Sequence, residues 1–406
     1  MTQENNSPEN KENPPFITQD TFKKLRIGVI FGGRSAEHEV SLRSAEAVLG
    51  ALDRARYDVT LIGITRAGRW LPLEAPDGEV DPAKLMLPFA NPEATDNTTH
   101  AALLPDPSIR GLAEIIEAEP GMGLEFGQPL DVIFPVLHGP YGEDGTMQGL
   151  LELANVPYVG PGVMASAVSM DKVVQREVCR QNGLPVIDFV QLKRRDWQAT
   201  EGNEPARAFI RSSIEVQIGY PCFVKPVNMG SAVGVSKARN AAELDKALNE
   251  AARYDRKLMV EKAVNPRELE VAVLGNDEPI ASVVGEISYS SEFYDYKTKY
   301  HTEDNAYYIP ANISSEQSEQ LRELAIKAYL ALDCAGMTRV DFFLDRDSGQ
   351  IYLNEVNTIP GFTSVSMYPM LWQASGITYP ELVDRLIKLA LERHADKNKN
   401  ELYPMV

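Results

Sequence analysis

The sequence predicts an α/β fold that becomes α+β in its C-terminal part. Near the N-terminus, an apolar strand at 25–31 ends in two glycines and precedes a helix at 39–52 that is apolar on one face. A second strand follows at 58–64, and this order is a βαβ unit, which implies a parallel sheet. Near the C-terminus, two segments that alternate polar and apolar residues flank the turn-rich stretch 345–350, a pattern typical of an antiparallel hairpin.

The composition is that of a soluble globular protein with two or three domains. Of its 406 residues, 44% are hydrophobic and 24% are charged, and it lacks the run of roughly eighteen apolar residues that predicts a transmembrane helix. The formal net charge of −18 argues against nucleic-acid and anionic-membrane partners. The three cysteines, Cys179, Cys222 and Cys334, are widely spaced in apolar surroundings, which predicts reduced core residues and a cytoplasmic protein.

The rest of the chain divides into a polar tail, a weakly patterned insertion and a series of helices and strands. Residues 1–22 are rich in Asn, Glu and Pro and lack the apolar core of a secretory signal, so we expect a disordered tail. Residues 71–128 have weak periodicity and are predicted to form loops and an insertion. The other predicted segments are, in chain order, a strand at 131–136, a glycine-rich turn at 138–145, a helix at 146–153, a linker at 159–162, a helix–strand–loop–strand–helix–strand series over 164–263, and further strands over 264–394 with a closing helix at 379–391.

The predicted C-terminal hairpin carries four polar side chains on one face. If the chain folds symmetrically about Ser348, Asp341 lies opposite Glu355 and Arg339 lies opposite Asn357. Two opposed carboxylates repel each other, and a divalent cation would remove that cost. Two carboxylates and an amide oxygen are hard ligands, suited to Mg²⁺ that carries the phosphates of a nucleotide. The alternative is a solvated sheet face on which Arg339 forms a salt bridge with one acid.

Two further segments have features of a nucleotide site. Residues 225–235 form a small-residue loop between two strands, where backbone N–H groups and Lys225 could bind an anion. This loop lacks the P-loop pattern, and taken alone it is better explained by an ordinary tight hairpin with one lysine. Residues 259–264 are predicted to be an edge strand that runs into a hinge, where Glu261 could accept a hydrogen bond from an adenine amino group. A strand with a solvated charged end is the alternative.

Other polar groups suggest a lid and a small-molecule site. Residues 285–311 are polar and rich in tyrosine, which is typical of a functional lid, although a hairpin with surface tyrosines has the same pattern. Ser35, Glu37 and His38 follow the first strand at a helix N-terminus, where Glu37 could hold a substrate ammonium or simply stabilise the helix dipole. His138 is either a site residue or a turn residue. The glycines after the first strand do not fit G-x-G-x-x-G, which argues against a nicotinamide oxidoreductase.

The order of these motifs resembles that of the D-alanine–D-alanine ligases of the ATP-grasp superfamily. The resemblance spans about 26–391. Its motifs are Ser-Ala-Glu-His-Glu-Val-Ser at 35–41, His-Gly-x-x-Gly-Glu-Asp-Gly at 138–145, Met-Asp-Lys at 170–172, Lys225-Pro226 with its glycine loop, Glu261-Lys262, the tyrosine-rich segment, Arg339-x-Asp341, and Asn-Glu-Val-Asn-Thr-Ile-Pro-Gly at 354–361.

This resemblance implies a three-domain ATP-grasp fold. Residues 23–160 would form an N-terminal parallel-sheet preATP-grasp domain, and 161–262 a central ATP-grasp subdomain. Residues 263–395 would form a C-terminal catalytic subdomain with its lid at 285–311. The family is commonly dimeric, so a cytoplasmic homodimer is expected.

The resemblance also implies roles for individual residues. The implied nucleotide contacts are Lys172, Lys225, Ser231, Glu261, Lys262, Val264, Glu268 and Lys299. The implied metal ligands are Asp341, Glu355 and Asn357, for two Mg²⁺ ions that Mn²⁺ could replace, with K⁺ as a further candidate ion. The implied catalytic and substrate-binding groups are Glu37, Ser231, Tyr300, Arg339, Gly361 and Ser366.

The implied activity is ATP-dependent joining of two D-alanines through an acyl phosphate, for peptidoglycan precursor synthesis. Relatives that use a D-hydroxy acid depart from tyrosine at the position of Tyr300, so this residue favours an amino-acid acceptor. A D-alanine–D-lactate or D-alanine–D-serine ligase is the alternative on the same scaffold. A nucleotide-binding regulator without turnover is an alternative of a different class, against which the intact lysine, metal and oxyanion positions argue.

Overall fold

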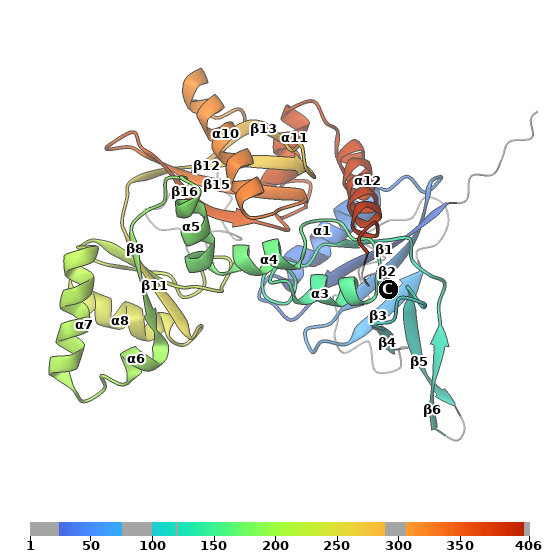
Figure 1. Cartoon of the computed structure of the whole chain (residues 1–406), viewed down its shortest axis with the longest axis horizontal. Coiled ribbons are helices and arrows are strands. Elements are labelled where there is room, and N and C mark those ends of the chain that lie inside the picture. The colour runs from blue at the N-terminus through green and yellow to red at the C-terminus, as the bar shows by residue number, and fades with distance from the viewer. Residues whose placement is uncertain (1–23, 75–99, 119–120, 289–305, 402–406) are drawn as a thin grey trace, which may run out of the picture.

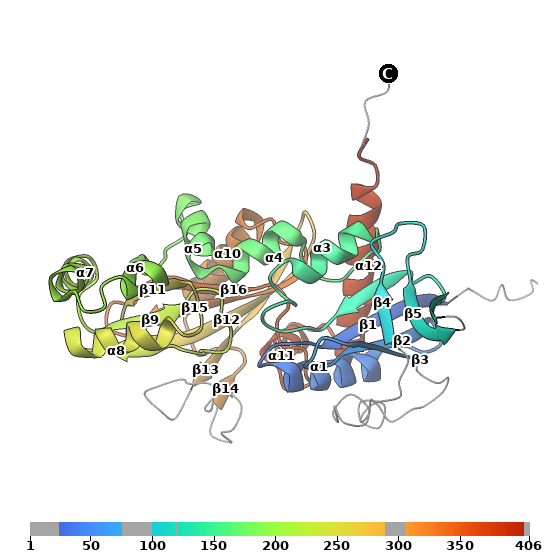
Figure 2. The ribbon, with the colours of Figure 1, turned by 90° about the horizontal axis from the view of Figure 1, so that it is seen from below.

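Three β-sheets organise the chain in the computed structural model, which describes residues 24–74, 100–118, 121–288 and 306–401 (Figure 1). Their strand orders are β6-β5-β4-β3-β2-β1-β7, β10-β9-β11-β8 and β14-β13-β12-β15-β16. Helices α3 (Thr146–Leu153), α4 (Val163–Met170) and α5 (Lys172–Gln181) run from the first sheet towards the other two, as Figure 2 shows from below. Mixed α/β architecture is therefore confirmed.

The N-terminal sheet contains the predicted βαβ unit. Strands β1 (Leu25–Gly32) and β2 (Tyr57–Ile64) pair in parallel and are connected by α1 (His38–Ala51). On its other side, β1 pairs in parallel with β7 (Val132–Pro135). The apolar residues of these strands are buried because the sheet is covered on both faces.

The prediction of loops over 71–128 is wrong for much of that range. Strands β3 (Trp70–Glu74), β4 (His100–Leu103), β5 (Leu112–Ala118) and β6 (Gly121–Phe126) extend the sheet in antiparallel fashion, so the sheet is mixed. In Figure 1, β5 and β6 project away from the rest of the molecule as a ribbon. A ribbon that buries little surface needs no alternation of apolar residues, which explains its weak sequence pattern.

The central sheet comprises β8 (Phe189–Lys193), β9 (Cys222–Pro226), β10 (Ser236–Ala238) and β11 (Lys257–Lys262). Three helices contact this sheet: α6 (Arg194–Gln198), α7 (Glu204–Gln217) and α8 (Ala241–Ala251). The sequence analysis predicted neither α6 nor α7. The prediction that 259–264 is an edge strand is wrong, because β11 pairs with β9 on one side and β8 on the other. At its charged end, the carboxylate of Glu261 is buried between cations, whereas Lys262 is exposed.

The C-terminal sheet comprises β12 (Pro266–Gly275), β13 (Ile280–Ser288), β14 (Ala306–Tyr308), β15 (Gly336–Asp345) and β16 (Ile351–Asn357). Helix α10 (Ser315–Ala331), which begins with a capping box at Ser314, packs on it together with α11 (Met367–Ala374). The closing helix is confirmed as α12 (Tyr379–Lys397), which contacts both the N-terminal and C-terminal sheets.

The cysteines are buried in the core, as expected. Cys179, Cys222 and Cys334 are free and buried, and burial raises the pKa of the Cys222 thiol to about 11. Within the described ranges, no helix combines the length and apolarity that crossing a membrane requires.

Candidate active site

One cavity of about 750 Å³ collects the predicted site residues from all three parts of the chain. Its walls come from α1, the loop after β9, β11, β12, β15, β16 and the segment before α11. The predicted residues that line it are Glu37, Lys172, Lys225, Ser231, Glu261, Lys262, Val264, Glu268, Arg339, Asp341, Glu355, Asn357, Gly361 and Ser366. The other two, Lys299 and Tyr300, lie outside the described residues, as does most of the predicted lid.

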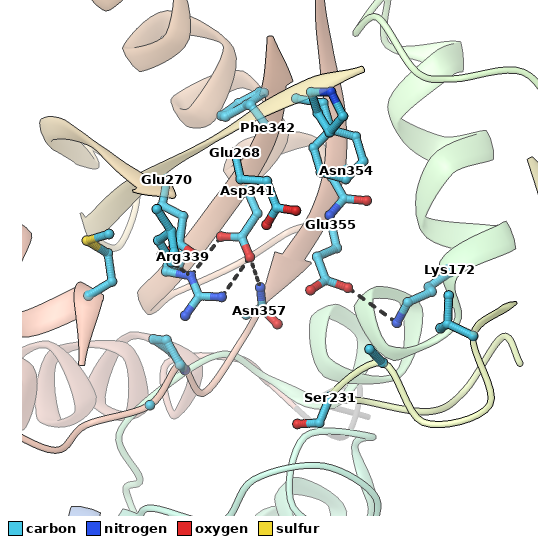
Figure 3. Close-up of a pocket in the computed structure, with 18 of the residues that line it drawn as sticks. Lys172, Ser231, Glu268, Glu270, Arg339, Asp341, Phe342, Asn354, Glu355 and Asn357 are labelled. Atoms are coloured by element: carbon cyan, nitrogen blue, oxygen red, sulfur yellow. Dashed lines mark hydrogen bonds and ion pairs between the residues drawn. The ribbon is translucent and has the colours of Figure 1, made fainter. Parts of the chain in front are cut away.

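The hairpin register is the predicted one. Arg339 pairs with Asn357 and Asp341 pairs with Glu355, and a bulge at Asn354 follows before the ladder resumes. Arg339 donates from Nε and Nη2 to the two oxygens of Asp341 at 2.7 and 2.6 Å, and Asn357 donates to Asp341 Oδ2 at 2.9 Å. Figure 3 shows Asp341, Glu355 and Asn357 pointing into the same space.

Glu270 completes the charge balance around Arg339. It lies opposite Asp341 on the neighbouring strand β12, and its Oε2 is 2.9 Å from Arg339 Nε. Burial disfavours the charge of the guanidinium, but Asp341 and Glu270 outweigh that effect and raise the pKa of Arg339. Arg339 is therefore a fixed cation on the cavity wall. Sequence reasoning missed Glu270, although its spacing of two from Glu268 places both side chains on one face of β12.

Lys172 connects the hairpin to the loop after β9. Its Nζ is 3.3 Å from Glu355 Oε2 and donates to the carbonyl of Met229 at 3.0 Å. The described residues hold no group of three or more His, Cys, Asp or Glu side chains suited to a metal. The ligand set is instead two opposed carboxylates and one amide, whose hard oxygens fit Mg²⁺. Arg339 neutralises Asp341 and Lys172 neutralises Glu355. A bound cation could neutralise both carboxylates in their stead.

A buried ion-pair cluster lies at the end of the cavity that β9 and β11 line. Glu261 forms ion pairs with Lys225 on β9 and with Arg176 on α5. Burial alone would raise the pKa of Glu261, but the two cations lower it. Arg176 also donates to the carbonyl of Asn354 at 3.3 Å and so holds the bulge that precedes Glu355. Sequence reasoning missed Arg176, because nothing near it in the chain indicates these partners.

Glu37 and Ser231 meet at the opposite end. Glu37 is the N-cap residue of α1, but its side chain makes no capping hydrogen bond. Its Oε1 instead accepts a hydrogen bond of 2.5 Å from Ser231 Oγ. The carboxylate is closely packed by glycines: a Cβ on Gly139 would lie 2.7 Å from Glu37 Oε2 and one on Gly230 would lie 3.1 Å from it. Gly139 also has a φ of 75°, a conformation that favours glycine.

Glu143 adds a second carboxyl group near Glu37 that sequence reasoning did not select. It accepts hydrogen bonds from the backbone N–H groups of Gly139 at 2.6 Å and Ile359 at 3.2 Å. Burial, and after it the charge of Glu37, raise the pKa of Glu143 to about 8. The sequence analysis included the motif at 138–145, but it gave Glu143 no role of its own. The contact of Glu143 with Ile359 and its proximity to Glu37 join segments that are distant in sequence.

The segment before α11 closes this end of the cavity. Ser366 precedes α11, and its Oγ accepts a hydrogen bond of 3.0 Å from the N–H of Thr363. A Cβ on Gly361 would lie 3.0 Å from Ser366 Oγ, so a side chain at this position would crowd that hydroxyl. Gly361, Arg339 and Ser366 all line the same cavity.

Comparison with known proteins gives a consistent result. The family described as D-ala D-ala ligase N-terminus matches residues 26–161, and the family described as D-ala D-ala ligase C-terminus matches residues 178–388. A D-alanine–D-alanine ligase of Heliobacterium modesticaldum is 50% identical over 93% of this chain and 97% of its own. One of Geobacillus kaustophilus is 47% identical over 92% and 96%, respectively.

Solved structures share the fold as well. The VanG D-Ala:D-Ser ligase from Enterococcus faecalis is 38% identical with a TM-score of 0.77, and 91% of this chain and 100% of that chain are covered. The D-alanine–D-alanine ligase from Coxiella burnetii is 37% identical with a TM-score of 0.71 over 93% and 96%. With both family regions matched and relatives this similar along almost their full length, the chain belongs to the D-alanine–D-alanine ligase family.

Proposed function

We propose that this enzyme joins two D-alanines to D-alanyl-D-alanine and converts ATP to ADP and phosphate, a step of peptidoglycan precursor synthesis. The observation that carries the proposal is the hairpin face, where Asp341, Glu355, Asn357 and Arg339 face the same cavity as Lys172. Phosphoryl transfer needs charge neutralisation and alignment of the reacting oxygens, and this arrangement of acids and cations can supply both.

ATP occupies the end of the cavity between the central and C-terminal sheets. Lys172, Lys225, Ser231 and Lys299 contact its phosphates. The adenine and ribose contacts are Glu261, Lys262, Val264 and Glu268. Asp341, Glu355 and Asn357 hold Mg²⁺, which neutralises phosphate charge when it is bound. We also propose that Mn²⁺ can replace Mg²⁺ and that K⁺ activates the enzyme.

The first D-alanine binds with its ammonium at Glu37, whose orientation Ser231 supports. One of its carboxylate oxygens attacks the γ-phosphorus of ATP, and the bond between that phosphorus and the bridging oxygen breaks, which releases ADP and leaves D-alanyl phosphate. Exclusion of water protects this acyl phosphate, a role that we assign to the segment 285–311 with Tyr300.

The second D-alanine binds with its carboxylate near Ser366 and Lys299. Its amine, after loss of a proton, attacks the acyl carbon, and the oxyanion that forms is stabilised by Arg339 and the N–H of Gly361. The attack forms the C–N bond, and collapse of the intermediate, with loss of a proton from that nitrogen, restores the carbonyl and releases phosphate. Arg339 suits the role because its charge is fixed by two acids.

The test is D-alanine-dependent release of ADP in the presence of Mg²⁺. Products from an equimolar mixture of D-alanine, D-serine and D-lactate near neutral pH then identify the acceptor. We expect mostly D-alanyl-D-alanine. A majority of D-alanyl-D-serine would favour the second candidate, which the similarity to a D-Ala:D-Ser ligase supports, and absence of ADP release would refute both ligase assignments.

We further propose that the protein works in the cytoplasm as a homodimer. The proposed domains span residues 23–160, 161–262 and 263–395. Free buried cysteines fit a reducing compartment. Sedimentation at micromolar concentration tests the dimer, and a mass of one chain would refute it.

A further inference from the structure

The backbone on both sides of Gly361 is anchored by side chains from other parts of the fold. Glu143 accepts from the N–H of Ile359 at 3.2 Å, and His138 Nδ1 lies 3.0 Å from the carbonyl of the same residue. On the other side, Ser44 Oγ accepts from the N–H of Phe362 at 3.3 Å. The hydroxyl of Tyr379 donates to the carbonyl of Phe362 at 2.5 Å. The backbone N–H and C=O groups of both Ile359 and Phe362 are thus held by side chains.

Two of these anchors, His138 and Ser44, are connected to each other, and together they form one chain of three hydrogen bonds from Ile359 to Phe362. The carbonyl of Ile359 can only accept, so His138 Nδ1 carries the proton. In the neutral ring Nε2 is then an acceptor, and it receives the hydroxyl proton of Ser44 at 3.0 Å. The oxygen of Ser44 remains available to accept from Phe362. Every group has one consistent role, and both Ser44 and His138 are buried.

We infer that Ser44, on α1, is a positioning residue for the oxyanion donor at Gly361. The inference rests on the proposed function, in which the N–H of Gly361 stabilises the tetrahedral intermediate. Ser44 does not line the cavity; it acts by fixing the backbone through Phe362 and, by way of His138, through Ile359. Since a donor must be preorganised to stabilise charge in the transition state, loss of this anchor lowers the rate rather than substrate binding.

The experiment compares Ser44→Ala with Ser41→Ala. Ser41 lies on the same helix and is equally buried, and its hydroxyl likewise has two partners, although both are backbone groups: it accepts from Gly32 at 2.8 Å and donates to Val136 at 2.5 Å. Gly32 ends β1 and Val136 directly follows β7, so neither belongs to the segment at Gly361. The measurements are kcat, KM for D-alanine, melting temperature, affinity for ADP, and affinity for a tetrahedral phosphinate analogue of the dipeptide in the presence of ATP.

We expect Ser44→Ala to lower kcat and to weaken phosphinate binding by about tenfold each, less than the roughly hundredfold loss expected when a donor itself is removed. Its KM for D-alanine and affinity for ADP should stay near wild type. Ser41→Ala should lower the melting temperature to a similar degree and leave kcat and phosphinate affinity within about twofold.

Equal effects of the two serine variants on kcat and phosphinate affinity would overturn the inference while leaving the proposed function intact. Wild-type protein that releases no ADP with D-alanine would overturn both. If Ser44→Ala does not fold, Tyr379→Phe removes only the anchor on the Phe362 carbonyl and tests the same idea. A Tyr379→Phe enzyme with unchanged kcat and phosphinate affinity would then decide against it.

Discussion

Individual charges in the cavity are neutralised by specific partners, although the chain as a whole carries a net charge of −18. Arg339 lies between two acids, and Lys172 faces a third. Anionic phosphates approaching such a protein would be repelled unless cations are concentrated at the site. These ion pairs therefore hold acids and cations together at the cavity before any ligand binds. A phosphate could then take the place of an acid beside its cation, and a metal ion could take the place of a cation beside its acid.

The first prediction concerns the acids of the hairpin. We expect Asp341→Asn and Glu355→Gln each to lower kcat about a hundredfold or more at saturating Mg²⁺, because each removes a carboxylate that we propose as a ligand of this ion. The fold should persist, since Arg339 keeps Glu270 as a partner. The measurement is steady-state ADP release, with circular dichroism as a check on folding.

The matched control is Asp347→Asn, which removes an exposed carboxylate from the turn of the same hairpin. Its kcat should equal that of wild type. Near wild-type turnover in either Asp341→Asn or Glu355→Gln would contradict the assignment of a metal site to this hairpin.

The second prediction concerns the pH dependence of stability. Glu143 has its pKa raised from 4.5 to about 8 by burial and by Glu37, so the folded protein holds a proton that the unfolded chain releases. Its contribution to stability is fully present below pH 4.5 and is lost as pH rises through about 8. Relative to wild type, Glu143→Gln should therefore gain melting temperature between pH 5 and pH 8, on the order of 5 °C.

Thermal melts without nucleotide or metal, at intervals from pH 5 to pH 9, measure this difference. Glu39→Gln removes an exposed carboxyl of α1 and should follow the wild-type curve. If the Glu143→Gln and wild-type curves run parallel over this range, Glu143 does not hold its proton in the native state.

Strands and helices are connected at the site by buried side chains whose partners lie far away in sequence. Arg176 on α5 holds Glu261 of β11 and the bulge of β16, and thereby connects the central and C-terminal sheets. We predict that Arg176→Met destabilises the protein by about 3 kcal/mol, because the charge of Glu261 would remain buried with Lys225 alone. Lys225 would then be held more firmly, so KM for ATP should rise.

Urea unfolding measures the stability change, and Arg180→Met provides the comparison. Arg180 lies one turn later on α5 and is exposed, although its guanidinium, like that of Arg176, lies over the ring of Phe189. Its loss should cost about 1 kcal/mol or less. Equal losses in both variants would show that the buried ion pairs contribute nothing beyond the aromatic contact.

Local periodicity predicted the hairpin well because a strand repeats every two residues and the turn residues fix its centre. That was enough to place Asp341 opposite Glu355, but the bulge at Asn354 has no local signal. Arg176 and Glu143 were missed because their partners lie 85 and 216 residues away. The prediction of β11 as an edge strand failed for the same reason, because its pairing with β8 and β9 depends on segments that are distant in sequence.

On a larger scale, the central part of the molecule has a hydrophobic core separate from those of the other two parts. One of those other cores joins the N-terminal and C-terminal sheets through α12, with Phe31, Met337 and Leu386 in a single cluster. The central sheet has its own smaller core, which contains Trp197. Since a smaller core contributes less burial, we expect the central part to unfold before the rest. Mg²⁺–ADP, which in our proposal binds between the central and C-terminal sheets, should bring the two transitions together.

Tryptophan fluorescence can test this because Trp197 and Trp372 lie in different cores and are both about 1% exposed. A Trp70→Phe/Trp372→Phe variant reports on Trp197, and a Trp70→Phe/Trp197→Phe variant reports on Trp372. In urea, the midpoint from Trp197 should be lower by roughly 0.5 to 1 M, and saturating Mg²⁺–ADP should reduce that gap by mass action. Coincident midpoints without nucleotide would mean that the buried contacts of Arg176 couple the central sheet to the rest strongly enough for the whole chain to unfold as one unit.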